Sequence, residues 1–502
     1  MSTAVIRTRA ICALDAPSVT VEAHLSPGLP AFNLVGLPET AVRESKDRVR
    51  SAILNSRFEF PARRITINLA PADLPKDGGR FDLAIALGIL AASGQVVSTD
   101  LDRYEFLGEL ALTGELRPVR GVLSSAIGCC RGERQLIIPQ ANGAEAALAV
   151  QERHLTARHL LDICAHLGGM AKLTPEAATP LPARQEGLPD MADIKGQHKA
   201  KRALEIAAAG NHNLLYEGPP GCGKSMLAQR LPGILPAMTE AEALSQLAIR
   251  SVISPEFDRS HWMRRPFRAP HHSASAVALV GGGNPPRPGE VSLAHKGVLF
   301  LDELPEFQRN VLEALREPME NGIIHISRAS SQASFPAEFQ LVAAMNPCPC
   351  GYHGDPTRAC SCSPEQVRRY RCRISGPLLD RIDMHLHLQP TPLNLLTLGN
   401  HPPEELSATI RERVEMSRVI QRERQGKPNA ALTGEELQTI ASFTPEAITT
   451  LHRIAGKLEL SARAFQRAQR VARTIADLSG KERVAADEVI EACSYRQPHR
   501  AG

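Results

Sequence analysis

Residues 213–231 read NLLYEGPPGCGKSMLAQRL, and this stretch decides the fold of the central part of the chain. The apolar segment NLLYE predicts a strand, and the run SMLAQRL predicts a helix. Between them lies a full match to the phosphate-binding pattern GxxxxGK[ST]. Its residues are Gly218, Pro219, Pro220, Gly221, Cys222, Gly223, Lys224 and Ser225. Such a loop aims backbone N–H groups at phosphates, so Lys224 is predicted to reach a nucleotide and Ser225 to bind Mg²⁺.

Two further apolar segments end in polar residues suited to the same chemistry. Residues 297–303, GVLFLDE, predict a strand that ends at Asp302 and Glu303. At the carboxyl end of a parallel strand, Asp302 could hold the Mg²⁺ and Glu303 could act as general base. Residues 339–346, FQLVAAMN, deliver Asn346, which could orient the water or sense the γ-phosphate. A solvated acidic strand end and a turn-capping asparagine are the structural alternatives.

The rest of the chain divides around this central part. Residues 1–170 alternate strand and helix patterns, and FDLAIALGILAASG at 81–94 has the character of a buried helix. Residues 171–189 are rich in proline and alanine and predict a linker. We expect a nucleotide domain at 190–395 and a helical domain at 396–502. One apolar helix face is formed there by Phe465, Ala468, Val471, Ala472 and Ile475.

The composition favours a globular protein of several domains. The 502 residues are 43% hydrophobic and 22% charged, which suits buried cores and argues against disorder. The formal net charge of +4 permits a polyanionic partner without requiring one. Neither a secretory signal nor a membrane-spanning stretch is recognisable, so we expect a cytoplasmic location and no membrane partner.

Longer strings carry a resemblance to a known family. They are RPFRAPHHSASAVALVGGG at 265–283, LAHKGVLFLDELPEF at 293–307, REPMENGIIHISRA at 316–329 and MNPCPCGYHGD at 345–355. Together with the P-loop, they resemble the magnesium-chelatase-like AAA+ ATPases, most closely the YifB/ComM family. The similarity covers nearly the whole chain. It implies an α/β fold with an N-terminal Lon-protease-like domain, a central P-loop AAA+ parallel-sheet domain and a C-terminal helical lid.

The resemblance also implies roles for individual residues and an assembly. Ile194, within ADIKGQ, matches the segment that contacts the adenine of ATP. Arg381, in GPLLDRID, matches an arginine finger that enters the neighbouring subunit's site, and Arg463, in LSARAFQR, matches the lid arginine that senses nucleotide. ATP and Mg²⁺ would be the cofactors of a homo-oligomeric ring, expected to be hexameric. Without the resemblance, each arginine would be interpreted as part of a surface salt bridge.

DNA is the partner that the family implies, through ATP-driven translocation or branch migration in recombination during natural transformation. IIHISRASSQASFPA at 323–337 has the form of a hairpin with Arg328 near its tip. A second basic cluster consists of Arg358, Arg368, Arg369, Arg371 and Arg373. A polyanion would suit both groups. Solvated faces or subunit contacts would suit them equally well.

The N-terminal domain resembles the Lon protease fold but departs from its Ser-Lys catalytic pair. Within PKDGGRFD, the position of the serine is taken by Arg80, and within RPVRGVLSSA that of the lysine is taken by Leu123. Without a nucleophile or its base, covalent catalysis has no starting point. We therefore expect a scaffold or interaction module.

Four of the eleven cysteines form two CxC pairs separated by nine residues: Cys348, Cys350, Cys360 and Cys362. In a reducing compartment such a cluster suggests metal before disulfide, and four thiolates suit Zn²⁺. The spacing departs from the common CxxC knuckle, so free or redox-labile thiols remain the alternative. His353 is an alternative ligand.

Two other functions compete with that of a DNA-translocating motor. A chelatase subunit would use ATP to drive magnesium into a tetrapyrrole, but the Lon-like N-terminal domain favours the YifB/ComM family. A non-enzymatic platform would only bind nucleotide, and the set Lys224, Asp302, Glu303 and Arg381 argues against it.

Overall fold

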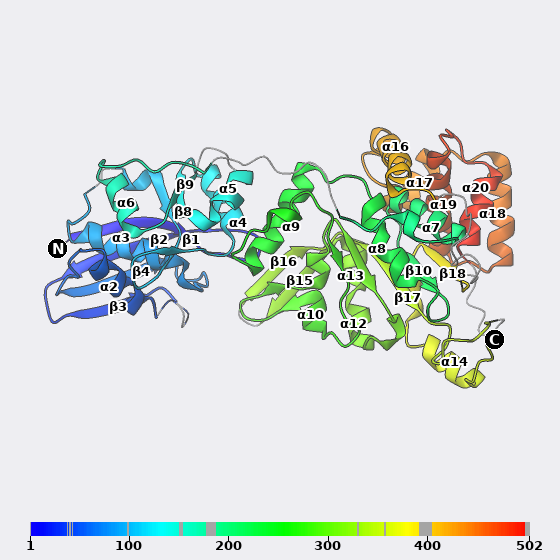
Figure 1. Ribbon diagram of the computed structural model, residues 1–502, viewed down its shortest axis with the longest axis horizontal. Helices are drawn as coiled ribbons and strands as arrows, with labels where there is room; N and C mark the ends of the chain where they lie inside the picture. Colours follow the sequence, from blue (N-terminus) through cyan, green and yellow to red (C-terminus); the bar gives the residue numbers. More distant parts are fainter. Residues whose placement is uncertain are drawn as a thin grey trace.

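The computed structural model describes residues 2–37, 39, 42, 44–97, 100–149, 154–176, 187–328, 331–355, 358–390 and 404–496. The chain is elongated, with an N-terminal α/β part at one end, a parallel sheet in the middle and a group of helices at the other end (Figure 1). The predicted combination of a mixed α/β fold, a parallel sheet and a helical C-terminal part is confirmed. The predicted linker at 171–189 includes residues 177–186, which lie outside the described ranges.

Two principal sheets build the N-terminal part. The first has the order β1-β2-β4-β3, in which only β3 and β4 are parallel, and the second has the parallel order β5-β8-β9. A small antiparallel pair, β6 and β7, lies beside them. The strands are β1 Ser2–Arg9, β2 Ser18–Ser26, β3 Ala31–Val35, β4 Arg64–Ala70, β5 Tyr104–Phe106, β6 Glu109–Leu110, β7 Leu116–Arg117, β8 Gln135–Pro139 and β9 His154–Ala157.

The core of this part forms around one apolar helix, α3, Asp82–Ala92. All of its residues except Ala91 are buried, which confirms the helix predicted within residues 81–94. Gly88 allows the helix to approach the sheet, because an added Cβ would lie 3.1 Å from the Cβ of Ala23. The other helices of this part are α2 Ser45–Asn55, α4 Val122–Arg131, α5 Gly143–Ala149 and α6 Leu160–Leu167.

The central sheet has five parallel strands in the order β11-β14-β17-β10-β18. They are β10 Leu214–Glu217, β11 Phe267–Arg268, β14 Val298–Leu301, β17 Gln340–Met345 and β18 Met384–His387. The strands predicted within 213–217, 297–303 and 339–346 are thereby confirmed. Both faces are covered, as parallel sheets require. Leu214 and Tyr216 join one apolar core, while Leu215 between them joins the other.

Both edges of this sheet offer little free backbone. Strand β11 is only two residues long and pairs with β14 through Phe267 and Arg268. At the opposite edge, the N–H of His385 in β18 donates to the carbonyl oxygen of Tyr495 at 2.8 Å. A residue close to the end of the described chain therefore covers that edge.

One helix, α7, precedes the first central strand, and further helices and two hairpins fill the connections between the central strands. The helices are α7 His198–Gly210, α8 Lys224–Ile234, α9 Glu240–Ile253, α10 Ala276–Val280, α11 Glu290–Leu293, α12 Arg309–Ala314, α13 Arg316–Asn321, α14 Pro364–Arg371 and α15 Gly376–Leu379. The hairpin predicted from residues 323–337 is confirmed as the antiparallel pair β15 Ile323–Arg328 and β16 Ser331–Pro336. A short pair, β12 Gly281–Gly282 and β13 Arg287–Pro288, precedes it.

The C-terminal part is helical and shares its core with the central sheet. Its helices are α16 Ser407–Gln425, α17 Gly434–Ile440, α18 Pro445–Lys457, α19 Ala462–Leu478 and α20 Ala486–Ser494. The apolar face predicted for α19 is confirmed, because Ala468, Val471, Ala472 and Ile475 belong to the same buried core as Leu214. In the ranges given above, none of the helices has both the length and the apolar character that a membrane crossing requires.

Candidate nucleotide site and four-cysteine cluster

The P-loop connects the carboxyl end of β10 to the N-terminus of α8 (Figure 1). Gly221 and Gly223 have φ values of 78° and 88°, in the left-handed region that side-chain-bearing residues rarely adopt. Gly223 directly precedes α8, so the loop turns onto the positive end of that helix. This geometry suits an anion such as a nucleotide phosphate.

Lys224 and Asn346 meet at the centre of the site. The Lys224 ammonium donates to the carbonyl oxygens of Gly218 at 2.6 Å and Pro219 at 3.0 Å, and to the side-chain oxygen of Asn346 at 3.0 Å. Burial lowers the pKa of Lys224 from its usual value, and Cys222 and Asp302 oppose that shift. The ammonium is thus surrounded by oxygen acceptors, which the oxygens of a bound phosphate could replace.

Ser225 and Asp302 form the second contact. The Ser225 hydroxyl donates to a carboxylate oxygen of Asp302 at 2.6 Å, and the other carboxylate oxygen accepts from the N–H of Glu303 at 2.9 Å. A hydroxyl and a carboxylate are the hard oxygen ligands that Mg²⁺ prefers. The residues therefore fit the predicted ATP and Mg²⁺ together.

Glu303 follows Asp302 with a φ of 52°, and its side chain is half exposed. His272, which sequence reasoning missed, lies against it, with Nδ1 3.1 Å from a carboxylate oxygen of Glu303. His272 follows β11, which pairs in parallel with β14, the strand that precedes Asp302 and Glu303. The sequence signal that could have indicated this residue is the histidine pair in RPFRAPHHS. In the structure, the ring centroids of His271 and His272 lie 4.1 Å apart.

The segment predicted to contact adenine lies beside the P-loop. Ile194 is buried, and its carbonyl oxygen accepts from the Lys201 ammonium at 2.5 Å. Gln197 donates to the carbonyl oxygen of Cys222, within the P-loop, at 3.4 Å. Lys201 also pairs with Glu404 at 2.6 Å, so this segment connects the nucleotide loop with the start of the C-terminal part.

The two predicted arginines lie in different surroundings. Arg381 is buried and forms an ion pair with Glu320, while its Nη1 donates to the carbonyl oxygen of Pro377 at 2.7 Å. Arg463 is exposed in the first turn of α19. A different arginine of that helix, Arg467, pairs with the buried Asp383.

The structure divides the predicted basic cluster. Three of its arginines are paired with carboxylates: Arg371 with Glu217 at 2.8 Å, Arg373 with Glu306 at 2.8 Å and Arg369 with Glu365 at 3.2 Å. Arg358 donates to the hydroxyl of Tyr352 at 2.8 Å and lies over its ring. Arg368 and Arg369 are exposed on α14. Arg328 ends β15 at the hairpin turn, but its side chain lies outside the described part of the structure.

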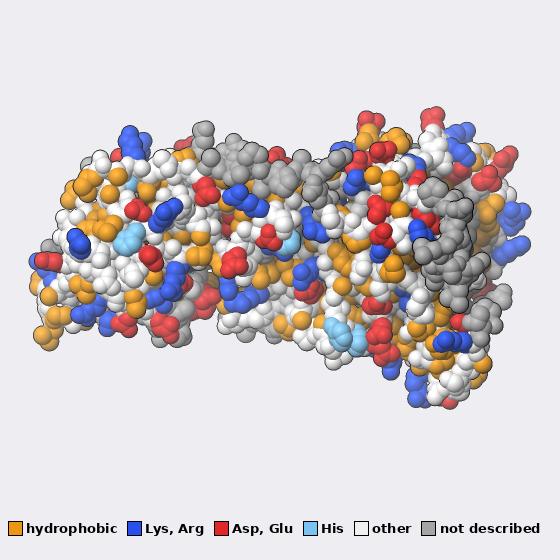
Figure 2. Space-filling model, viewed as in Figure 1, with side chains coloured by type: hydrophobic (Ala, Val, Ile, Leu, Met, Phe, Trp, Pro, Cys, Tyr) orange, Lys and Arg blue, Asp and Glu red, His pale blue; other side chains and the backbone are white. Residues whose placement is uncertain are grey.

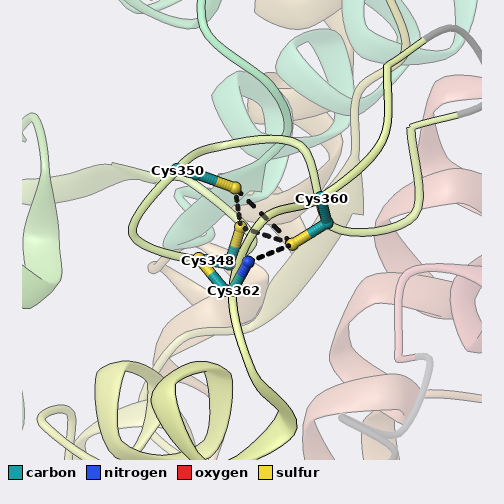
Figure 3. A group of neighbouring side chains, drawn as sticks. All are labelled: Cys348, Cys350, Cys360 and Cys362. Carbon is teal, nitrogen blue, oxygen red and sulfur yellow. Dashed lines mark hydrogen bonds between the residues drawn. The ribbon is translucent and has the colours of Figure 1, made fainter.

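The four cysteines converge on one point of the loop that follows β17 (Figure 3). Their sulfur atoms all lie within 4.8 Å of one another, and three separations are 3.3, 3.5 and 3.7 Å. Tetrahedral zinc with Zn–S bonds of about 2.3 Å needs sulfur atoms about 3.8 Å apart. The thiols are free of disulfides, and their arrangement fits a single Zn²⁺. His353 is not among the converging residues.

In the N-terminal part, Arg80 is buried and donates to the hydroxyl of Ser125 at 2.9 Å. That hydroxyl itself donates to the carbonyl oxygen of Gly121 at 2.9 Å. Leu123 is buried in α4, as an apolar residue should be. Arg80 also lines a cavity of about 720 Å³ that it shares with Gln332 and Ala333 of the hairpin. Figure 2 shows basic and acidic side chains interspersed over the face of the molecule that it draws.

Comparisons with known proteins match all three parts. The family described as "Magnesium chelatase, subunit ChlI" matches residues 190–395. "Subunit ChlI of Mg-chelatase" matches residues 21–142, and "Magnesium chelatase, subunit ChlI C-terminal" matches residues 404–496.

Two of the individual relatives match nearly the full length of the chain, and a third matches a part of it. Competence protein ComM of Haemophilus influenzae is 50% identical, covering 99% of this chain and 98% of that protein. YifB of Escherichia coli is also 50% identical, covering 99% of this chain and 97% of that protein. A magnesium-chelatase 67 kDa subunit of Chlorobaculum parvum is 26% identical over 31% of this chain and 23% of that protein.

Proposed function

Because the chain belongs to the ComM/YifB family of magnesium-chelatase-like AAA+ proteins, we propose that it hydrolyses ATP and uses the energy to translocate or remodel DNA. The observation that carries the ATPase is the meeting of three strand ends. Lys224 follows β10 and contacts Asn346 after β17, while Ser225 contacts Asp302 after β14. These pairs combine a phosphate-binding cation, a metal-binding couple and a polar sensor.

In this proposal each residue has a separate task. Mg²⁺-bound ATP supplies the phosphoryl group that is transferred to water. Lys224 binds the β- and γ-phosphates, and Ser225 and Asp302 hold the metal. Glu303 accepts a proton from the attacking water, and Asn346 orients that water. Ile194 contributes to the adenine pocket.

We propose further that the subunits assemble as a ring, expected to be hexameric, in which Arg381 acts on the neighbouring site and Arg463 senses nucleotide. The burial of Arg381 against Glu320 means that this ion pair must open first. The same proposal divides the chain into an N-terminal domain (1–170), a linker (171–189), a nucleotide domain (190–395) and a helical domain (396–502). It assigns the nucleotide chemistry to the middle part and a scaffold role to residues 1–170.

DNA is the proposed track, and branch migration or helicase action during natural transformation is the proposed task. The name of the Haemophilus influenzae relative, a competence protein, supports this assignment. Arg328 at the hairpin turn and Arg368 and Arg369 on α14 are the candidate phosphate contacts. Exposed arginines suit a phosphate backbone without requiring any base sequence.

The sharpest test is the ATPase rate with single-stranded, duplex and branched DNA at fixed ionic strength. DNA stimulation, strongest with one of these forms, is expected. Lys224→Ala provides the inactive control. A rate that DNA leaves unchanged but that a tetrapyrrole with its partner subunits raises would instead favour the chelatase function, which the family descriptions also support.

We also propose that Cys348, Cys350, Cys360 and Cys362 bind one structural Zn²⁺. A closed four-thiolate site binds zinc without an open position for substrate. Purified protein should carry about one zinc per chain, and replacing Cys348 and Cys362 by serine should remove it. Cys12→Ser, at an exposed cysteine of the N-terminal part, is the matched control. Metal-free protein with four freely titrating thiols at these positions would exclude the site.

A further inference from the structure

The loop that carries the four cysteines, called the cysteine loop below, lies between β17 and α14 and contacts the nucleotide site. It begins at Asn346, whose side chain contacts Lys224, and reaches the first cysteine only two residues later. Cys348 is fully buried at this point. A metal ion bound to Cys348 would therefore fix the backbone immediately beside the residue that faces the P-loop lysine.

A second contact joins the loop to the tip of the P-loop. Gly351, directly after Cys350, has a φ of 88°, and its N–H donates to the carbonyl oxygen of Cys348 at 3.0 Å. An added Cβ at Gly351 would lie 2.6 Å from Cδ and 2.8 Å from Cγ of Pro220. The backbone of the loop thus rests on Pro220 with no room for a side chain.

A third contact returns from the far end of the loop. Cys360 and Cys362 lead into α14, and the last residue of that helix, Arg371, reaches back to the nucleotide site. Its Nε donates to the carbonyl oxygen of Pro347 at 3.2 Å, and its Nη2 donates to the buried carboxylate of Glu217 at 2.8 Å. Glu217 is the last residue before the P-loop. Arg371, which follows the last two cysteines, therefore contacts both Pro347 at the start of the cysteine loop and the strand end from which the P-loop begins.

Four thiolates on one ion would join the two ends of this loop. Without that crosslink, the contacts made by Asn346, Gly351 and Arg371 would depend on a loop with little regular secondary structure. Ordering such a loop costs conformational entropy. A bound metal removes this cost before nucleotide arrives. Pre-ordering a binding loop raises affinity for the same reason.

We infer that metal binding by the four cysteines organises the nucleotide site through Asn346 and Gly351. Loss of the metal should weaken nucleotide binding while the rest of the fold persists. This inference rests on the proposed zinc and ATP sites and adds a dependence of the second on the first. If Asn346, the proposed γ-phosphate sensor, is displaced, one hydrogen bond to that charged group is lost, which corresponds to roughly tenfold or more in affinity.

The experiment measures binding of a fluorescent ATP analogue with Mg²⁺ to full-length protein in three states: zinc-loaded, stripped by a chelator, and reloaded with Zn²⁺. Zinc content is measured on the same samples, and circular dichroism checks the fold. Stripping should raise Kd roughly tenfold, and reloading should restore it. Cys12→Ser protein treated in parallel should respond as wild type.

Gly351→Ala keeps all four cysteines and tests the contact directly. It should retain zinc and yet bind the analogue more weakly, because the new methyl group must displace Pro220 and alanine resists the left-handed backbone conformation of Gly351. This variant decides the question if stripped protein unfolds.

Stripped, folded protein that binds the analogue as tightly as loaded protein would overturn the inference. So would wild-type affinity in zinc-loaded Gly351→Ala. Loaded wild-type protein that fails to bind the analogue would instead contradict the proposed ATP site. Protein purified without metal that binds the analogue normally would contradict the zinc site and this inference, but not the ATP site.

Discussion

Replacing Arg381 by alanine should abolish ATP hydrolysis and leave nucleotide binding intact, because the proposed role of Arg381 lies in the neighbouring subunit's site. Within its own chain the guanidinium is held by Glu320 and by the carbonyl oxygen of Pro377. Its Nε is buried and has no hydrogen-bond partner within the described residues. The side chain therefore keeps one donor that a further acceptor could use.

A comparison of two free energies, that of the Arg381–Glu320 ion pair and that gained in the transition state, favours release of Arg381 from Glu320 when subunits assemble. The side chain of Arg381 is only 6% exposed, but that of Glu320 is 49% exposed, so solvent screens the carboxylate end of the ion pair and the pair contributes about 1 kcal/mol. An arginine that acts in trans accelerates phosphoryl transfer by ~10³–10⁵, or about 4–7 kcal/mol. Opening the pair thus costs much less than the transition state gains. Glu320→Gln should change turnover by less than about fivefold, whereas Arg381→Ala should lower it by ~10³ or more.

The assay is steady-state phosphate release, with binding of a fluorescent ATP analogue measured separately. Mixing Arg381→Ala with Lys224→Ala protein should restore part of the activity, because some interfaces then combine an intact P-loop with an intact arginine. Fluorescence transfer between labelled subunits confirms exchange. If exchanged mixtures stay inactive, or if Arg381→Ala turns over normally, the role in trans is wrong.

Lys224→Ala should lose binding of the ATP analogue, since the site then lacks its buried ammonium, and wild-type affinity would contradict the P-loop assignment. Glu303→Gln should bind ATP but hydrolyse it ~10²–10⁴-fold more slowly than the wild type, and a wild-type rate of hydrolysis would exclude the general-base role. His272→Ala should lower kcat without changing nucleotide affinity, because its imidazole lies 3.1 Å from the carboxylate of Glu303, the proposed general base; an effect on affinity alone would argue against a positioning role. Arg328→Ala should weaken DNA binding for all sequences and flatten the salt dependence by roughly one unit; unchanged binding would leave α14 as the candidate surface. Burial raises the pKa of Glu145 to about 7, so the folded state binds its proton more tightly and stability falls as pH rises from about 4.5 to 7. Glu145→Gln should remove up to ~3 kcal/mol of that fall in denaturant titrations, and an unchanged pH profile would refute it.

The sequence predicted what depends on short stretches of chain. The P-loop, the acidic end of β14 and Asn346 each follow a recognisable apolar strand, and parallel strands bring such ends to one edge of a sheet. The buried helix α3 and the apolar face of α19 were equally local patterns. The convergence of the four cysteines was also foreseeable, because they occupy a single loop.

Side-chain partners that lie far apart in sequence could not be predicted in this way. Arg371 pairs with Glu217 across 154 positions, and Arg381 pairs with Glu320 across 61. The basic cluster therefore appeared more strongly charged in the sequence than it is once its carboxylate partners are present. His272 was missed for the same reason, since only the alignment of β11 beside β14 brings it to Glu303.

The closed edges of the central sheet limit how copies of this chain can join. An exposed edge strand offers unpaired N–H and C=O groups to which a strand of another molecule can add. Here β11 offers only two residues, and Tyr495 occupies a donor of β18. Extension of the central sheet from one subunit into the next is therefore disfavoured. Contacts between copies at these two edges would instead be made mainly by side chains, which can separate and re-form as subunits move.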